Sequence, residues 1–147
     1  MRSKMKLVIT ESIHGTKRWR LDGKLHRKDG PAVENLSGAK EWYINGKRHR
    51  EDGPAVQWTD GEKQWWVNGE LHREDGPTIE YVDGSKHWLI SGKHHRKDGP
   101  AVEYADGEKY WFIDGEPINL EEIIKDYPDG YGPWTASDLI KFKLKYL

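Results

Sequence analysis

The chain repeats itself with a fixed period of 23 residues. Tryptophan recurs at this spacing five times, at Trp19, Trp42, Trp65, Trp88 and Trp111. Glycine keeps the same period, at Gly23, Gly46, Gly69, Gly92 and Gly115. An internal repeat without insertion or deletion predicts identical supersecondary units that bury their apolar surface against one another. The chain is therefore expected to form an array of stacked units.

Each unit shows the alternation of side chains that is typical of strands. In residues 62 to 84 the alternation covers residues 63 to 68 and residues 77 to 82, which predicts two strands. An eight-residue connection, residues 69 to 76, separates them. The dipeptide Asp83-Gly84 follows the second strand and predicts a two-residue primed turn, because glycine accepts a positive φ.

Stacked units of this kind predict an all-β fold, an antiparallel meander of about ten strands in a single sheet. Equivalent residues would lie two strands apart, roughly 9 to 10 Å. We expect the five tryptophans to form the core face. The same face should carry Val33, Val56, Ile79, Val102, Trp58, Tyr81 and Tyr104, and the opposite face Arg20, Tyr43, Trp66, Leu89 and Phe112.

The ends of the chain depart from the repeat. Residues 1 to 18 predict an N-terminal strand and a partial repeat, and residues 19 to 116 hold the repeats. Residues 117 to 147 predict a small C-terminal cap, helical or mixed, with a short helix at residues 120 to 126. The tail, residues 135 to 147, fits either a helix or a strand.

Composition narrows the function classes. The sequence has 24 basic and 25 acidic side chains and a net charge of −1, so no overall field attracts nucleic acid or an anionic membrane. It has no cysteine, which excludes a thiolate nucleophile, a disulfide and a cysteine metal site. No catalytic motif is present, and no apolar run could span a membrane. These features predict a cytoplasmic protein without enzymatic activity, metal or cofactor.

The segment WYINGKRHREDGPAVQWTDGEKQ, residues 42 to 64, resembles the 23-residue MORN repeat. It is closer still to the HREDGPA-type repeat of uncharacterised phage and bacterial proteins. The resemblance covers residues 8 to 116 and departs at one position, where arginine follows histidine in place of the glycine of MORN repeats. It implies stacked hairpins that act as a non-enzymatic protein-interaction scaffold.

The His-Arg pair of the motif has a structural interpretation. Each arginine precedes an aspartate by two residues, as Arg50 precedes Asp52, and a guanidinium that binds this carboxylate or a nearby carbonyl would hold the turn. The histidine would pack against the tryptophans and donate a hydrogen bond to the backbone of the next loop. Repetition favours this interpretation, because a stacking contact must recur in every unit.

A second interpretation treats the arginines as a site for anions. Their spacing could suit the phosphates of a nucleotide, a cyclic oligonucleotide or a single strand, with a base stacked on Tyr43, Trp66 or Phe112. A third possibility is a self-assembling scaffold or homo-oligomer, since the open sheet is aromatic on both faces.

The sequence therefore predicts a binding module that engages a protein partner, as a phage-type accessory or inhibitor protein engaging a host component would. Nucleotide sequestration and self-assembly are the alternatives. The residues expected to contact the partner or ligand are His26, Arg27, His49, Arg50, His72, Arg73, His95, Arg96, Tyr43, Trp66 and Phe112.

Overall fold

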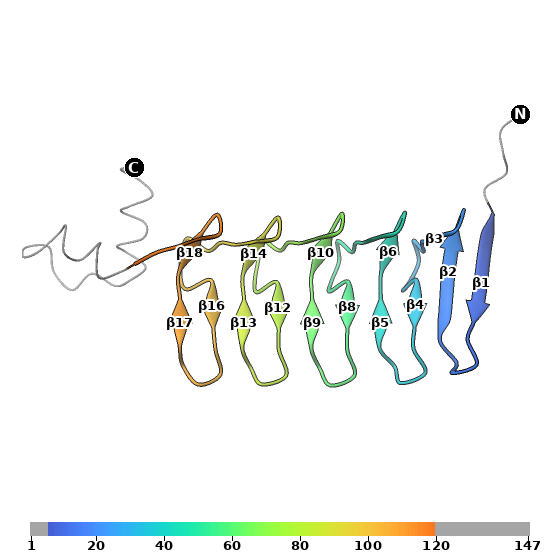
Figure 1. Ribbon diagram of the computed structural model, residues 1–147, viewed down its shortest axis with the longest axis horizontal. Helices are drawn as coiled ribbons and strands as arrows, with labels where there is room; N and C mark the ends of the chain where they lie inside the picture. The colour runs from blue at the N-terminus through green and yellow to red at the C-terminus, as the bar shows by residue number, and fades with distance from the viewer. Residues whose placement is uncertain (1–5, 120–147) are drawn as a thin grey trace, which may run out of the picture.

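The computed structural model describes residues 6 to 119, which form one elongated antiparallel meander (Figure 1). No helix occurs in this part of the chain, and the predicted all-β meander is confirmed. Accordingly, residues 6 to 119 offer no helix with the length and apolar character needed to cross a membrane. The predicted helix at residues 120 to 126 and the tail lie outside the described residues.

The main sheet runs the length of the array. Its strands follow the order β1-β2-β4-β5-β8-β9-β12-β13-β16-β17, and β3 pairs with β2. Apart from the two long strands at the N-terminal end, each contributes two residues. The bounds are β1 Leu7–Glu11, β2 Lys17–Leu21, β3 Lys24–Leu25, β4 Val33–Glu34, β5 Lys40–Glu41, β8 Val56–Gln57, β9 Lys63–Gln64, β12 Ile79–Glu80, β13 Lys86–His87, β16 Val102–Glu103 and β17 Lys109–Tyr110.

Four short hairpins lie along one edge of this sheet, at the top of Figure 1. They are β6 (Tyr43–Ile44) with β7 (Lys47–Arg48), β10 (Trp66–Val67) with β11 (Glu70–Leu71), β14 (Leu89–Ile90) with β15 (Lys93–His94), and β18 (Phe112–Ile113) with β19 (Glu116–Pro117). The strand predicted over residues 63 to 68 is therefore divided at Trp65. Its first half pairs in the main sheet, and its second half belongs to a hairpin.

The primed turns lie in these hairpins. Asn68 and Gly69 have φ of 53° and 88°, the two consecutive positive values that a type I′ turn requires. Asn45 and Gly46, with 51° and 81°, repeat this geometry one unit earlier. The prediction of a primed turn at Asp83-Gly84 is wrong, because only the glycine has a positive φ there and the loop is one residue longer.

The loop at Asp83-Gly84 is a three-residue connection. Tyr81 N–H donates to Ser85 O at 3.0 Å, and Gly84 N–H donates back to Tyr81 O at 3.1 Å. This pattern, with Gly84 at φ 93°, is that of a turn followed by a left-handed bulge residue. Asp83 Oδ1 accepts the Ser85 N–H at 2.8 Å, so the aspartate serves the backbone of the turn.

The two faces of the main sheet differ in chemistry. Directly paired residues share a face, and on one face the pairs form a ladder of alternating lysine and glutamate, as Lys86 does with Glu80 and Glu103. The opposite face alternates buried aliphatic residues with larger polar ones, as Ile79 does with Gln64 and His87. The first of these surfaces, which we call the ladder face, comprises Glu11, Lys17, Glu34, Lys40, Gln57, Lys63, Glu80, Lys86, Glu103 and Lys109.

The core consists mainly of alanine and aliphatic side chains, and the expectation that tryptophan forms it is wrong. The five repeated tryptophans are only partly buried. Most of the buried residues come from the Pro-Ala-Val segments and their equivalents, and Ala39 and Leu89 are also buried. The buried residues of these segments are Ala32, Val33, Ala55, Val56, Thr78, Ile79, Ala101 and Val102. In β2, Trp19 and Arg18 are neighbours and so point to opposite faces, and Val33 pairs with Arg18. The valine and tryptophan side chains therefore occupy opposite faces of the sheet, and the expectation that they share one face is wrong.

Successive units are joined by a second set of backbone contacts near the hairpins. Arg27 N–H donates to Tyr43 O at 3.0 Å, and Gly46 N–H donates to Leu25 O at 2.8 Å. The equivalent pair of bonds recurs at each later junction between units. Each unit is thus held to the next both by the main sheet and by the edge that carries the motif.

Candidate functional site

The arginine of the motif is built into its own unit. In the third unit the guanidinium of Arg73 lies 4.0 Å from the centre of the Trp65 ring. Its Nε donates to Asp75 at 2.8 Å, and its Nη1 donates to the carbonyl of Pro77 at 3.1 Å. The predicted bonds to a carboxylate and a carbonyl are confirmed. These contacts close the loop between the hairpin and the next strand of the main sheet.

The same set of contacts recurs in the other units. The distance from guanidinium carbon to tryptophan ring centre is 4.2 Å for Arg27, 4.1 Å for Arg50 and 4.0 Å for Arg96. A second carboxylate, seven residues on, binds Arg27 and Arg96 at 3.0 Å and Arg73 at 3.5 Å. In the second unit this position holds Gln57.

The glycine of the motif makes room for this stack. A Cβ atom on Gly76 would lie 2.9 Å from the guanidinium carbon of Arg73, closer than packed atoms allow. The equivalent distance is 2.9 to 3.1 Å in the other three units. The guanidinium therefore lies between an aromatic ring and a bare glycine backbone. Close approach, rather than a positive φ, explains the glycine here.

The histidine of the motif joins its unit to the next one. His49 Nδ1 accepts the backbone N–H of Asn68 at 3.1 Å, and His72 Nδ1 accepts that of Ser91 at 3.2 Å. His26 and His95 lie 3.1 and 3.2 Å from the equivalent N–H groups, and their Nδ1 atoms also lie 2.9 Å from Asn45 Oδ1 and 2.8 Å from Asp114 Oδ1. At His49 and His72 this acceptor role is opposite to the donor role predicted from the sequence. Its cause is the left-handed residue of the type I′ turn, whose N–H faces the preceding unit.

The surface of the motif edge is acidic between the second and third units. An open groove between the second and third loops is lined by both guanidinium groups and their neighbouring carboxylates. The side chains of Arg50 and Arg73 are 21% exposed, whereas those of Asp52 and Asp75 are 84% and 85% exposed. Hydrogen bonds from the two arginines lower the pKa of these carboxyl groups. A ligand that approaches this groove meets negative charge first.

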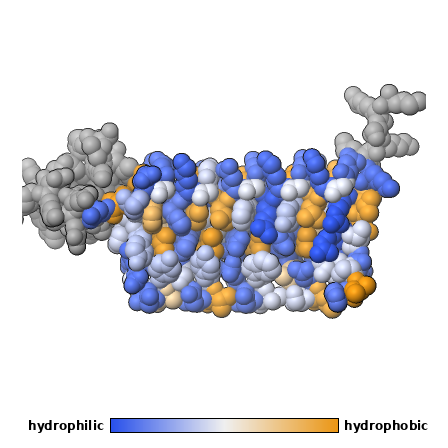
Figure 2. All heavy atoms as spheres, viewed as in Figure 1, coloured by the Kyte–Doolittle hydropathy of each residue, from blue (hydrophilic) through white to orange (hydrophobic). Residues whose placement is uncertain are grey.

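Many of the positions that differ most in chemistry from unit to unit lie on the face opposite the ladder. We call this surface the variable face. It comprises Arg18, Glu41, Gln64, His87, Tyr110, Arg20, Tyr43, Trp66, Leu89, Phe112, Leu25, Arg48, Leu71, His94, Trp58, Tyr81 and Tyr104. In the view of Figure 2, hydrophobic and hydrophilic residues alternate in bands along the array. The arginine and histidine of the motif are the same in each of its four copies, whereas the side chains on this face differ in size, charge and polarity.

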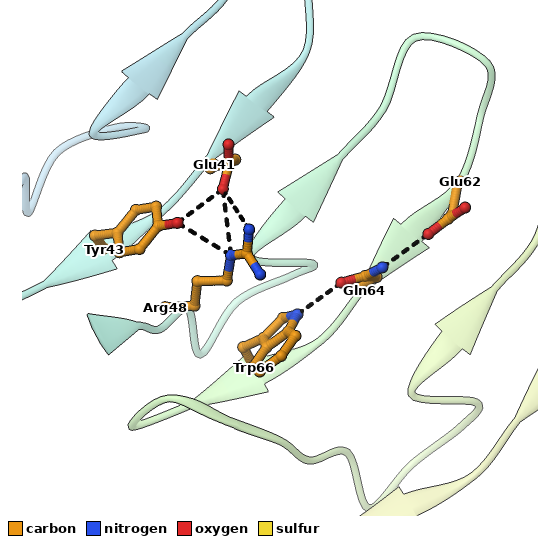
Figure 3. Close-up of polar contacts among 6 residues, drawn as sticks. All are labelled: Glu41, Tyr43, Arg48, Glu62, Gln64 and Trp66. Atoms are coloured by element: carbon orange, nitrogen blue, oxygen red, sulfur yellow. Dashed lines mark hydrogen bonds and ion pairs between the residues drawn. The ribbon is translucent and has the colours of Figure 1, made fainter. Parts of the chain in front are cut away.

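A polar cluster occupies the variable face in the second unit (Figure 3). Glu41 accepts the phenol proton of Tyr43 at 2.8 Å and binds Arg48 at 2.9 Å, and its side chain is 13% exposed. Burial raises the pKa of Tyr43, and the adjacent carboxylate of Glu41 raises it further. Arg48 also lies 5.2 Å from the ring centre of Trp66 in the next unit. The cluster fixes the orientation of two aromatic rings across a unit boundary.

The third unit continues this arrangement with Gln64 in the place of Glu41. Trp66 Nε1–H donates to Gln64 Oε1 at 3.0 Å, and Gln64 Nε2–H donates to Glu62 at 2.7 Å (Figure 3). The indole nitrogen is thereby satisfied, and part of the ring remains at the surface. An oriented and partly exposed indole is suited to contact a partner.

The fourth unit replaces these groups with an aromatic cluster centred on His87. The His87 ring lies 5.1 Å from Tyr81, 5.1 Å from His94 and 5.8 Å from Tyr104. Its Nδ1 lies 3.2 Å from His94 Nε2. Burial lowers the pKa of both histidines, and the adjacent His94 lowers the pKa of His87 further. Phe112 extends the cluster by stacking 5.2 Å from His94.

The predicted contact residues therefore divide into two groups. The four histidines and four arginines of the motif are engaged within the scaffold, whereas Tyr43, Trp66 and Phe112 lie on the variable face. Sequence reasoning missed the polar partners of these aromatic residues, which are Glu41, Arg48, Gln64, His87 and His94. A usable signal was present, because these positions change in chemistry from unit to unit while the tryptophan, glycine, arginine and proline of the repeat stay constant.

No family model matches this sequence, and a search of curated proteins also found no match. The resemblance to MORN repeats stays a prediction that rests on the motif. Within residues 6 to 119 there is no group of three or more side chains that could hold a metal ion.

Proposed function

We propose that the chain is a non-enzymatic binding module that engages another protein through the variable face. The observation that carries this proposal is that some positions of the repeat build the scaffold while others form the variable face. The motif arginines and histidines are bound within the scaffold, whereas many of the positions that change most in chemistry from unit to unit share one face. A scaffold with constant supports and a varied surface suits recognition of a partner that is itself irregular.

The chemistry of the variable face supports a protein partner. Tyrosine, tryptophan and arginine are enriched at the centres of protein interfaces, because they offer large contact areas with a polar group attached. Tyr43, Trp66 and Arg48 provide these three residue types within two adjacent units. Their mutual contacts reduce the conformational entropy that binding would otherwise cost.

The charge along the turn edge of the variable face suits a basic segment of the partner. Trp58 and Tyr104 are 38% and 44% exposed, and each lies in a hairpin whose turn carries an aspartate and a glutamate. The ladder lysines point to the other side of the sheet. Carboxylates beside exposed aromatic rings attract lysine and arginine side chains through ion pairing and cation–π contacts.

The resemblance to HREDGPA-type repeats adds a setting for this proposal. A phage-type accessory or inhibitor protein that engages a host component in the cytoplasm fits a small binding module. Nucleotide sequestration by the motif arginines has less support, since their Nε and Nη1 groups are already bound and the exposed groups of the groove are carboxylates.

The test begins with a partner isolated on the tagged full-length chain and then purified. Trp66→Ala and Phe112→Ala should each raise the Kd for this partner, about 30-fold for an interface hot spot. Lys63→Ala and Lys86→Ala, on the ladder face, serve as matched controls and should leave the Kd nearly unchanged. Thermal unfolding of all four variants shows whether each remains folded.

Two results would contradict the proposal. Equal losses of affinity in the ladder variants and the variable-face variants would show that the partner does not bind through the variable face in particular. Retention of a nucleotide by the purified chain, lost in Arg50→Gln with Arg73→Gln while the fold persists, would favour sequestration instead.

A further inference from the structure

The strand at the N-terminal end of the array has an open outer edge. β1 is the first strand of the main sheet, and within residues 6 to 119 only β2 pairs with it. Its five residues pair continuously with β2, from Leu7 opposite Leu21 to Glu11 opposite Lys17. The next strand of the main sheet, β4, contributes two residues. A long, regular edge strand is a template for pairing with another strand.

The backbone groups that face outward can be assigned from the hydrogen bonds to β2. Lys6 O accepts the N–H of Asp22 at 3.0 Å, and Ser12 N–H donates to Thr16 O at 3.0 Å. Backbone groups alternate in direction along an antiparallel strand, so the even-numbered residues face β2. The N–H and C=O groups of Leu7, Ile9 and Glu11 therefore point away from the sheet.

Side chains at this edge are unusually apolar for a surface strand. Leu7 and Ile9 are 61% and 58% exposed. β1 holds no lysine and no proline, the residues that commonly protect an edge. The opposite end of the described sheet differs, because β17 contributes only Lys109 and Tyr110. The two ends therefore do not match each other, and a chain of units joined end to end is not favoured.

We propose that β1 pairs with β1 of a second copy of the chain, antiparallel about a two-fold axis at Ile9. In this register Ile9 faces Ile9 of the second copy, and Leu7 faces Glu11. All three pairs use outward-facing backbone groups, and each exchanges two hydrogen bonds. The interface is self-complementary, so it closes after two copies.

This pairing has a geometric consequence for the whole assembly. Directly opposite residues share a face, so the two-fold axis runs perpendicular to the joined sheet. Both ladder faces then lie on one side, and both variable faces lie on the other. The dimer would present two variable faces side by side, which raises the avidity for a partner with two sites. The pairing itself does not depend on the proposed function.

A cysteine at the two-fold axis gives a direct test, because the chain has no cysteine of its own. In a hydrogen-bonded antiparallel pair the two Cα atoms lie about 5.5 Å apart, within the range of a disulfide. Full-length Ile9→Cys should form a covalent dimer under mild oxidation. Ile13→Cys is the matched control, since Ile13 is 96% exposed and lies beyond the strand.

The expected result is that Ile9→Cys forms a disulfide about 100-fold faster than Ile13→Cys at equal protein concentration, because pairing makes the reaction effectively intramolecular. Equal rates would overturn the proposal. In sedimentation experiments over a range of concentrations, Ile9→Pro should weaken dimerisation, because proline removes the outward N–H without breaking a bond to β2. A dimer that Ile9→Pro leaves unchanged would show that the interface lies elsewhere. A chain that stays monomeric at every concentration would exclude the β1–β1 dimer.

Discussion

The guanidinium of Arg73 lies 4.0 Å from the ring centre of Trp65, the repeated tryptophan of the same unit. The contact explains why arginine and tryptophan recur with the same period. It also explains why the motif arginines are only 21 to 24% exposed, although they lie in loops. The loops of this protein are held by their own side chains.

Replacement of this arginine should destabilise the fold. Arg73→Gln removes the ion pair with Asp75, the bond to the Pro77 carbonyl and the stack on Trp65. We expect the free energy of unfolding to fall by about 1 to 3 kcal/mol and the Tm by several degrees. Urea unfolding measures the first quantity and calorimetry the second. Lys97→Gln, which changes an exposed cation, should stay within about 0.5 kcal/mol of the wild type.

The glycine that faces the guanidinium should be coupled to it. Gly76→Ala places a methyl group against Arg73 and should lower the free energy of unfolding by about 1 to 3 kcal/mol. In an Arg73→Ala background the same substitution should cost little, because the clash is gone. A double-mutant cycle measures this coupling. An equal cost in both backgrounds would show that the backbone, and not the arginine, requires glycine.

The second unit has room for one stabilising substitution. Gln57 occupies the position at which the other units place a glutamate against the motif arginine, and it pairs with Lys40 and Lys63 across the sheet. Gln57→Glu should complete the ladder and give Arg50 a second carboxylate, which adds about 0.2 to 1 kcal/mol. Gln57→Lys, with like charges on both sides, should have the opposite effect. A loss of stability in the glutamate variant would argue against the ladder.

The His87 cluster should make stability depend on pH. Burial lowers the pKa of His87 and of His94 below the ordinary value of 6.5, so the unfolded chain binds protons more readily than the folded chain. Stability from this cluster is therefore complete above about pH 6.5 and is lost as the pH falls through the lowered values. The other groups around His87 are Tyr81, Tyr104 and Asp83.

Unfolding in urea across this pH range checks the dependence. His87→Phe keeps a ring among the two tyrosines and removes one titrating group, so its free energy of unfolding should fall less steeply below pH 6.5. His14→Gln, at an exposed position, is the control and should keep the slope of the wild type. A His87→Phe slope that matches the wild type would exclude the cluster as the source.

Prediction from sequence succeeded where a residue's role depends on its own unit. The 23-residue period, the antiparallel meander and the bond between Arg73 and Asp75 follow from spacing and from short-range chemistry. The sequence also indicates the position of the primed turn, because Asn68-Gly69 is the typical dipeptide of a type I′ turn. It was missed because a continuous strand was assumed up to that glycine.

Tertiary structure decided what depends on neighbouring units. Alternation alone could not show that the strand divides at Trp65, so the tryptophans and valines were placed on one face when they lie on two. The acceptor role of His49 depends on a left-handed residue 19 positions away. The variable face likewise depends on the register between units. The sequence determined the repeating unit, because its contacts are local, and the tertiary structure decided which side chains remained for a partner, because stacking uses the rest.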